Sequence, residues 1–220
     1  MTGLVAFDLD GTLLDTPRAI VTAFAATLDC LGLPERDPQE IRATVGRPLE
    51  DAFAQLLGAE RDDPLVERAV GQYQRLYRER IVPKAAGLLF PGVDQGLALL
   101  ARHGHRLAVA TNKYTRSAKA LLDAAGIRER FAMIVGADAV TKPKPDAEAA
   151  LLISRVLGVG PAQAVVVGDT THDLGMARNA GMRSVAVTYG VHATAQLKVA
   201  EPTWLADSFD AAVDCILQAR

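Results

Sequence analysis

The chain has 220 residues, of which half are hydrophobic, with 24 basic and 26 acidic side chains and a net charge of −2. This length and composition favour a folded chain with a large core over a disordered one, and the charge balance provides no basic surface for nucleic acid or membrane. Cys30 and Cys215 lie far apart, which argues against a disulfide framework or zinc cluster. Since no signal peptide or long apolar run stands out, we expect a cytoplasmic protein.

Short apolar runs alternate with helical patterns along most of the chain. Continuous apolar runs are typical of parallel strands that are covered on both faces. Helical patterns, with apolar residues at i, i+3, i+4 and i+7, follow over 118–125 and again from about Pro145. The alternation predicts an α/β fold with a doubly wound, mostly parallel sheet and a Rossmann-like core. The expected strands are residues 4–7, 107–110, 132–135, 164–167 and 184–187.

One stretch interrupts this alternation, because residues 16–83 carry helix signals only. Thr16 is a plausible N-cap before Pro17, and further helices are expected over 48–57 and 64–80. We therefore predict a helical domain over 16–83, inserted into a core formed by 1–15 and 84–220.

Polar residues follow several of the expected strands, where ligands bind in doubly wound sheets. Asp8 and Asp10, at i and i+2, face one side of an extended chain, and Asp169 and Asp173 follow a later strand. Close carboxylates repel unless a cation intervenes, and oxygen ligands without histidine or thiolate favour Mg²⁺. With the Thr111 hydroxyl and nearby lysines, these groups predict a site for a phosphoryl group.

The run Phe-Asp-Leu-Asp-Gly-Thr-Leu at 7–13 resembles the first motif, DxDGTL, of the haloacid dehalogenase-like hydrolase superfamily. The helical insertion and the residues 111–113, 142–145 and 188–190 make the chain similar to the phosphoglycolate phosphatase group. It is also similar to β-phosphoglucomutases and to small pyrophosphatases with the same type of insertion, which forms a cap.

The resemblance implies a role for each matched residue. Asp8 matches the nucleophile that forms an aspartyl-phosphate, and Asp10 matches the general acid and base. Thr111 matches the phosphate-binding hydroxyl, and Lys142 the lysine that holds nucleophile and phosphate, with Lys144 expected in solvent. The implied metal ligands are Asp169, the Asp8 carboxylate, the Asp10 backbone carbonyl and, often through water, Asp173. In this family an aspartate at Asp10, together with Asp169, argues for phosphoryl transfer rather than dehalogenation.

Three further residues are candidates for substrate binding. Asn112 and Lys113 either line the phosphate pocket or cap a helix. Arg47 lies between two insertion helices and either stays in solvent or reaches over the site to a substrate anion.

The expected activity is Mg²⁺-dependent hydrolysis of a small phosphomonoester, with phosphoglycolate as the first candidate and pyrophosphate or sugar phosphates as alternatives. The expected partner is therefore a small phosphorylated metabolite, not a nucleic acid or membrane, and the protein is a monomer or homodimer. A phospho-accepting receiver domain uses a similar set of groups, but the large insertion and Asp10 argue against it. A binding protein with a phosphatase fold that has lost its catalytic activity is a further alternative.

Overall fold

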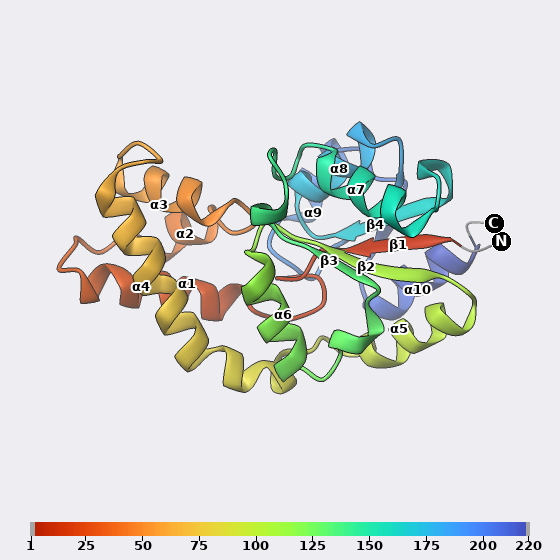
Figure 1. Ribbon diagram of the computed structural model, residues 1–220, viewed down its shortest axis with the longest axis horizontal. Coiled ribbons are helices and arrows are strands. Elements are labelled where there is room, and N and C mark those ends of the chain that lie inside the picture. The colour runs from red at the N-terminus through yellow and green to blue at the C-terminus, as the bar shows by residue number, and fades with distance from the viewer. Residues whose placement is uncertain (1–2, 219–220) are drawn as a thin grey trace.

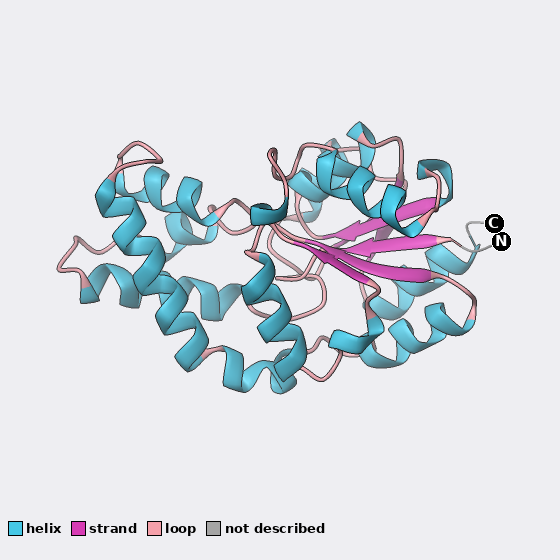
Figure 2. Cartoon of the chain, viewed as in Figure 1, coloured by secondary structure: helices cyan, strands magenta, loops and turns pink. Residues whose placement is uncertain are grey.

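The computed structural model describes residues 3–218 and contains a six-stranded, all-parallel sheet with the strand order β3-β2-β1-β4-β5-β6 (Figure 2). This confirms the predicted α/β fold, and all five expected strands are present. The sixth strand, a short edge strand of three residues, was not predicted from the sequence. The strands are β1 (Leu4–Phe7), β2 (Arg106–Ala110), β3 (Met133–Val135), β4 (Ala164–Gly168), β5 (Arg183–Val187) and β6 (Trp204–Ala206).

Helices cover both faces of the sheet (Figure 1). In β1, Val5 and Phe7 pack with α5 (Val93–Arg102) and α10 (Phe209–Gln218), while Leu4 and Ala6 pack with α7 (Glu148–Leu157) and α8 (Thr171–Asn179). All four side chains are buried. Successive residues of a strand point to opposite faces, so a strand covered on both faces is apolar throughout. The remaining helices of this part are α6 (Thr115–Ala124) and α9 (Thr194–Val199).

Helix α7 begins at Glu148, not near Pro145 as predicted. The backbone N–H of Asp146 donates to the Pro143 carbonyl in a turn, and the Asp146 carboxylate accepts from the Glu148 N–H. This turn ends the loop after β3 that carries Lys142 and Lys144.

Residues 17–80, in the chain between β1 and β2, form four α-helices beyond the carboxyl edge of the sheet (Figure 1). The Phe24 ring lies 4.5 Å from the Phe53 ring and 4.7 Å from the Tyr73 ring, so these helices share an aromatic core. The third and fourth helices match the predicted ranges, whereas the short second one was not expected; Asp37 caps its N-terminus. They are α1 (Pro17–Cys30), α2 (Pro38–Arg42), α3 (Leu49–Leu57) and α4 (Pro64–Arg80).

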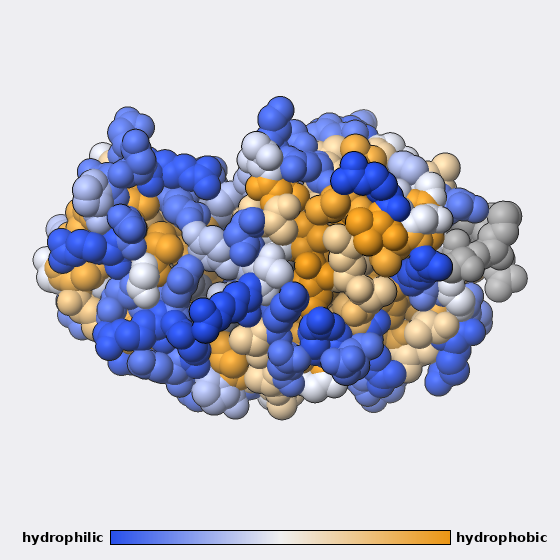
Figure 3. Space-filling view, viewed as in Figure 1, coloured by the Kyte–Doolittle hydropathy of each residue, from blue (hydrophilic) through white to orange (hydrophobic). Residues whose placement is uncertain are grey.

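The two segments that join these helices to the rest of the chain lie side by side. Leu14 and Leu89 form an antiparallel bridge, the Asp15 N–H donates to the Leu88 carbonyl at 2.7 Å, and the Phe90 N–H donates to the Leu13 carbonyl at 3.1 Å. The outline of the molecule is notched between the lobe of α1–α4 and the lobe that contains the sheet (Figure 3). Across residues 3–218, none of the helices has the length and apolar character needed to cross a membrane.

Candidate active site

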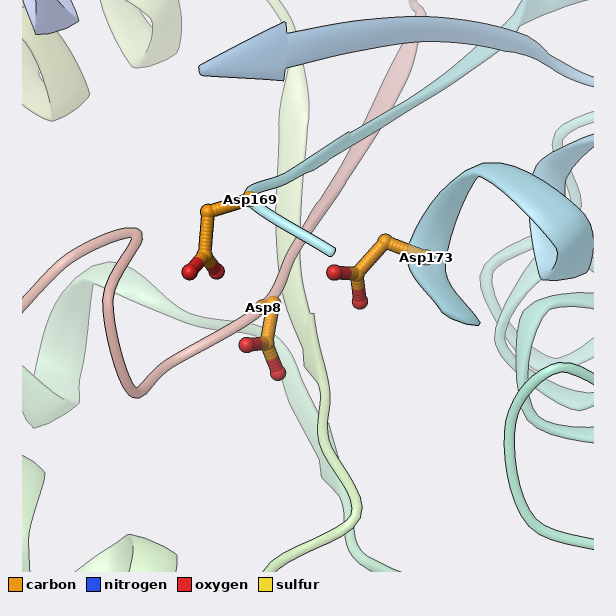
Figure 4. A group of neighbouring side chains, drawn as sticks. All are labelled: Asp8, Asp169 and Asp173. Carbon is orange, nitrogen blue, oxygen red and sulfur yellow. The ribbon is translucent and has the colours of Figure 1, made fainter. Parts of the chain in front are cut away.

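Three carboxylates meet at the carboxyl ends of the central strands. Asp8 follows β1, Asp169 follows the neighbouring strand β4, and Asp173 lies in the first turn of α8 (Figure 4). One oxygen from each lies within 4.8 Å of the others, and all three residues are buried. The strand order changes direction at β1, which is where doubly wound sheets place their ligands.

The loops around Asp169 approach its carboxylate closely. Its Oδ1 accepts a hydrogen bond from the Thr12 hydroxyl at 2.8 Å, and its Oδ2 accepts one from the Val191 N–H at 2.7 Å. A Cβ atom at Gly11 or Gly190 would lie 2.3 Å from Oδ2, and Gly11 also has a φ of +90°. Both positions therefore require glycine, and the Gly-Thr pair after Asp10 fixes Asp169 rather than only making a turn.

The structure corrects the choice of lysine. The Lys144 Nζ donates to Asp8 Oδ1 at 2.6 Å, to Asp173 Oδ1 at 2.7 Å and to the Ala110 carbonyl at 3.0 Å. Lys144 is only 4% exposed, whereas Lys142, the predicted lysine, is exposed and contacts Glu148 through its backbone N–H. Two Lys-Pro pairs follow each other here, so the motif can be aligned in two registers.

Burial dominates the electrostatics of this cluster. Burial raises the pKa of Asp8 to about 6, although the Lys144 charge lowers it in part. Burial, followed by the charges of Asp8 and Asp173, also raises the pKa of Asp169 well above its usual value. Burial alone would lower the pKa of Lys144, but the two neighbouring carboxylates raise it above its usual range, so Lys144 stays cationic.

This donor set fits a divalent cation. Three buried carboxylates face one lysine, so the cluster retains excess negative charge that a cation would offset. Oxygen-only ligands suit Mg²⁺. One Asp173 oxygen accepts from both the N–H and the hydroxyl of Thr170, and the other accepts from Lys144. The Asp173 carboxylate therefore accepts more hydrogen bonds from protein groups than the Asp169 carboxylate does.

The Asp10 carboxylate points away from the three others and toward the insertion helices. Its Oδ1 accepts from the Thr16 hydroxyl at 2.6 Å and from the Tyr77 hydroxyl at 3.4 Å, while Oδ2 pairs with the Lys113 Nζ at 2.8 Å. Thr16 precedes α1, but its hydroxyl binds Asp10 and does not cap the helix as predicted. Asp10 lies outside the carboxylate group described above, so only its backbone carbonyl is left as the expected metal ligand.

The residues after β2 divide into two kinds. Thr111 is buried beside the site, and its hydroxyl accepts from the Lys113 N–H, so its own hydrogen is available to a ligand. Asn112, predicted to bind substrate, uses both amide hydrogens within the protein, on the carbonyls of Gly46 and Lys144, and its Oδ1 accepts from the Lys144 N–H. Asn112 therefore positions Lys144 and holds the loop before α3.

A cavity lies between the sheet edge and the insertion helices and opens to solvent. Six of the predicted site residues line it: Asp8, Asp10, Arg47, Thr111, Asn112 and Lys113. Arg47 is exposed there. Tyr77 was not predicted as a site residue. Its hydroxyl contacts Asp10, and the centre of its ring lies 4.2 Å from the Lys113 Nζ. Nothing in the local sequence of α4 distinguishes this tyrosine.

The chain belongs to the haloacid dehalogenase-like hydrolase family, whose model matches residues 5–187. Within that family it falls in the phosphoglycolate phosphatase-like group and is a phosphoric monoester hydrolase. The family membership agrees with the resemblance seen in the motifs, and it favours an enzyme over a phospho-accepting receiver domain.

Known proteins similar to this chain cover nearly all of it. A Dickeya dadantii protein named "Probable phosphatase IndB" is 53% identical over 97% of this chain and 93% of its own length. A phosphoglycolate phosphatase of Chromobacterium violaceum is 39% identical over 84% of this chain and 85% of its own. An N-acetylmuramic acid 6-phosphate phosphatase of Pseudomonas aeruginosa is 33% identical over 96% of both chains. The solved structure of a haloacid dehalogenase-like family hydrolase from Streptococcus pneumoniae matches with a TM-score of 0.84 at 28% identity, over 97% of this chain and 98% of the other.

Proposed function

We propose that this protein hydrolyses small phosphomonoesters in a Mg²⁺-dependent reaction that passes through an aspartyl-phosphate on Asp8. One observation supports this most directly. Asp8 is buried at the centre of the cluster, with Oδ1 bound by the Lys144 ammonium group and, among the described residues, no hydrogen-bond donor on Oδ2. An oriented carboxylate with one free oxygen is the nucleophile that such a double displacement needs.

In the first step an Asp8 oxygen attacks phosphorus, and the bond from phosphorus to the ester oxygen breaks. Asp10 gives its proton to the departing oxygen, so the alcohol leaves neutral. In the second step water attacks phosphorus, Asp10 takes a proton from that water, and the bond to Asp8 breaks. Inorganic phosphate leaves, and both carboxyl groups return to their starting states.

The surrounding side chains stabilise charge on the transferring group. In this proposal Lys144 and the Thr111 hydroxyl bind phosphoryl oxygens, and Lys113, which pairs with Asp10 and lines the cavity, adds positive charge nearby. An arriving phosphoryl group competes with Asp10 for Lys113, which frees the Asp10 carboxyl to exchange protons.

Asp8, Asp169 and the Asp10 carbonyl would hold Mg²⁺, with Asp173 supporting the site through Lys144 or water. A divalent ion supplies Lewis-acid stabilisation of negative charge that builds up on the phosphoryl oxygens. Asp169 is the main ligand in this proposal because, of the two later aspartates, it makes fewer hydrogen bonds to the protein.

Residues 16–83 act as a cap in this proposal, over a catalytic core of 1–15 and 84–220. Cap residues contact the catalytic side through Gly46, whose carbonyl accepts from Asn112, and through Arg42, which donates to the Gly190 carbonyl at 3.2 Å. Tyr114 after β2 also binds Glu50 of α3. Closure of the cap limits water around the reactive intermediate.

Phosphoglycolate and a sugar phosphate are both candidate substrates, since relatives of this chain are named for each. Arg47 is the cap cation that could meet the carboxylate of phosphoglycolate.

Asp8→Asn tests the proposal, because it retains the shape of the side chain and removes the nucleophile. We expect phosphate release from 4-nitrophenyl phosphate with Mg²⁺ to fall by at least about 10⁴-fold in kcat, with an unchanged circular dichroism spectrum. Excess chelator should abolish wild-type turnover, and added Mg²⁺ should restore it. Turnover in excess chelator, or substantial kcat in Asp8→Asn, would refute the proposal.

A further inference from the structure

The cavity above Asp8 has a wall that the proposed phosphoryl chemistry does not need. This wall comes from the insertion helices and the loop before α3, and its side chains are mainly aliphatic and aromatic. They are buried or half-buried, so they form the inner part of the cavity rather than its outer surface. The wall consists of Ile20, Phe24, Val45, Leu49, Tyr73 and Tyr77.

The aromatic members of this wall form a continuous row. The rings of Phe24 and Tyr73 lie 4.7 Å apart between centroids, and those of Tyr73 and Tyr77 lie 5.7 Å apart. These separations are within the range of stacked and tilted aromatic pairs. A flat ring that enters the cavity can therefore pack against these aromatic rings in the same stacked or tilted arrangement.

Positive charge is scarce on the same wall. Among the described residues that line the cavity, the lysines and arginines are Arg47 and Lys113. Lys113 is already paired with Asp10 and lies over the Tyr77 ring, and Arg47 is exposed. A second anionic group bound against the buried aromatic rings, rather than at the exposed Arg47, would lose its hydration beside a lysine that is already paired, which is unfavourable.

We infer that the alcohol released from the phosphomonoester carries an uncharged, flat aromatic or heteroaromatic ring, and that the row of Phe24, Tyr73 and Tyr77 binds it. This inference rests on the proposed function, because the site of phosphoryl transfer fixes where the alcohol portion lies. It distinguishes this protein from an enzyme that selects a small carboxylate such as glycolate. The hydroxyl groups of the two tyrosines give a heteroaromatic ring polar atoms to contact.

Three phosphate esters of primary alcohols test the inference: benzyl phosphate, ethyl phosphate and phosphoglycolate. Their ester bonds are of the same kind, so differences in kcat/KM report mainly how the remainder of the molecule is bound. Burial of a phenyl ring predicts a kcat/KM for benzyl phosphate about 10- to 100-fold above that for ethyl phosphate. Phosphoglycolate should not exceed ethyl phosphate. Calorimetry should show the same order for benzylphosphonate and ethylphosphonate, without turnover.

A pair of variants on one helix locates the effect. Leu49 and Leu57 are both half-buried on α3, but only Leu49 belongs to the wall of the cavity. Leu49→Arg places a cation in the wall, so we expect the ratio of kcat/KM for benzyl phosphate to that for phosphoglycolate to fall at least about 10-fold. Leu57→Arg should leave the ratio within about twofold. Equal effects of the two variants would overturn the assignment to this wall.

The outcomes separate this inference from the proposed function. If none of these esters, nor 4-nitrophenyl phosphate, releases phosphate with Mg²⁺, the proposed function fails. If phosphate is released but benzyl phosphate and ethyl phosphate react equally well, only the inference fails. A wild-type preference for phosphoglycolate that Arg47→Ala abolishes would also overturn it and assign selectivity to Arg47.

Discussion

Lys142 and Lys144 are two residues apart, both precede a proline, and yet have opposite surroundings. Lys144 extends into the sheet edge and contacts Asp8 and Asp173, whereas Lys142 is exposed. The electrostatic interaction of a buried ammonium group with two carboxylates is much stronger than that of an exposed one, because water screens the charge of the exposed group. The two lysines should therefore differ sharply in mutational effect.

Lys144→Met should lower kcat by about 10²–10³-fold, because the variant loses the positive charge beside the nucleophile and the phosphoryl group. Lys142→Met should stay within about twofold of the wild type, as expected for an exposed side chain. Phosphate release with Mg²⁺ measures both. Lys144→Arg retains the positive charge and so controls for the loss of charge. Circular dichroism of each variant shows whether it is still folded. Equal losses in the 142 and 144 variants would contradict the correction.

Asp10→Asn should retain the backbone carbonyl but remove proton transfer, which is worth about 10²–10⁴-fold in rate. The loss should be large for ethyl phosphate and much smaller for 4-nitrophenyl phosphate, whose leaving group needs no proton. Asp15→Asn is the matched control, since Asp15 is exposed in the same segment. A loss of equal size on both substrates would argue that Asp10 acts only through its ion pair with Lys113.

At the scale of elements, the packing of α5 against α10 shows how the core tolerates no extra volume. Gly96 lies within α5, and a Cβ there would lie 2.7 Å from Phe209 Cε1 and 2.9 Å from Val213 Cγ2. Gly71 lies within α4 and has nothing within 4 Å of the same position. The same substitution should therefore have opposite effects at the two sites.

Gly96→Ala should decrease the free energy of unfolding by about 1–2 kcal/mol, because overpacking outweighs the better helix propensity of alanine. Gly71→Ala should increase it by about 0.5–1 kcal/mol, since only propensity changes. Urea unfolding followed by circular dichroism measures both. Stabilisation by Gly96→Ala would show that α5 and α10 can separate without cost.

At the scale of the whole molecule, Asn112 links three parts of the chain that are distant in sequence. It follows β2, donates to the Gly46 carbonyl before α3, and holds both backbone groups of Lys144. The segment before α3 and the backbone of Lys144 are thereby tied to one amide. Asn179 makes a comparable but exposed contact on the same loop, to the Pro145 carbonyl at 2.9 Å.

Asn112→Ala should lower kcat by about 10-fold or more through displacement of Lys144, and should cost about 1–3 kcal/mol of stability, since buried backbone groups lose their partners. Asn179→Ala should change either quantity by much less, because water replaces the lost contact. Steady-state kinetics and thermal unfolding measure the pair. If Asn112→Ala raises KM alone and leaves kcat unchanged, the residue binds substrate after all.

The sequence by itself determined five of the six strands, the helical character of the insertion and the meeting of Asp8 with Asp169, because these depend on local patterns. Apolar runs report burial on both faces, and residues that follow parallel strands must meet at one edge of the sheet. Its motifs also led to the family.

Only the tertiary structure decided which lysine reaches Asp8, that the Asn112 amide is used within the protein, and that Tyr77 contacts Asp10. Each of these depends on where a loop or a distant helix lies in space. Lys142 and Lys144 each precede a proline, and Tyr77 is one of two tyrosines on α4. Contacts between residues far apart in the chain leave no periodicity or spacing in the sequence, so the chemistry of the cavity wall became visible only when the helices were packed against the sheet.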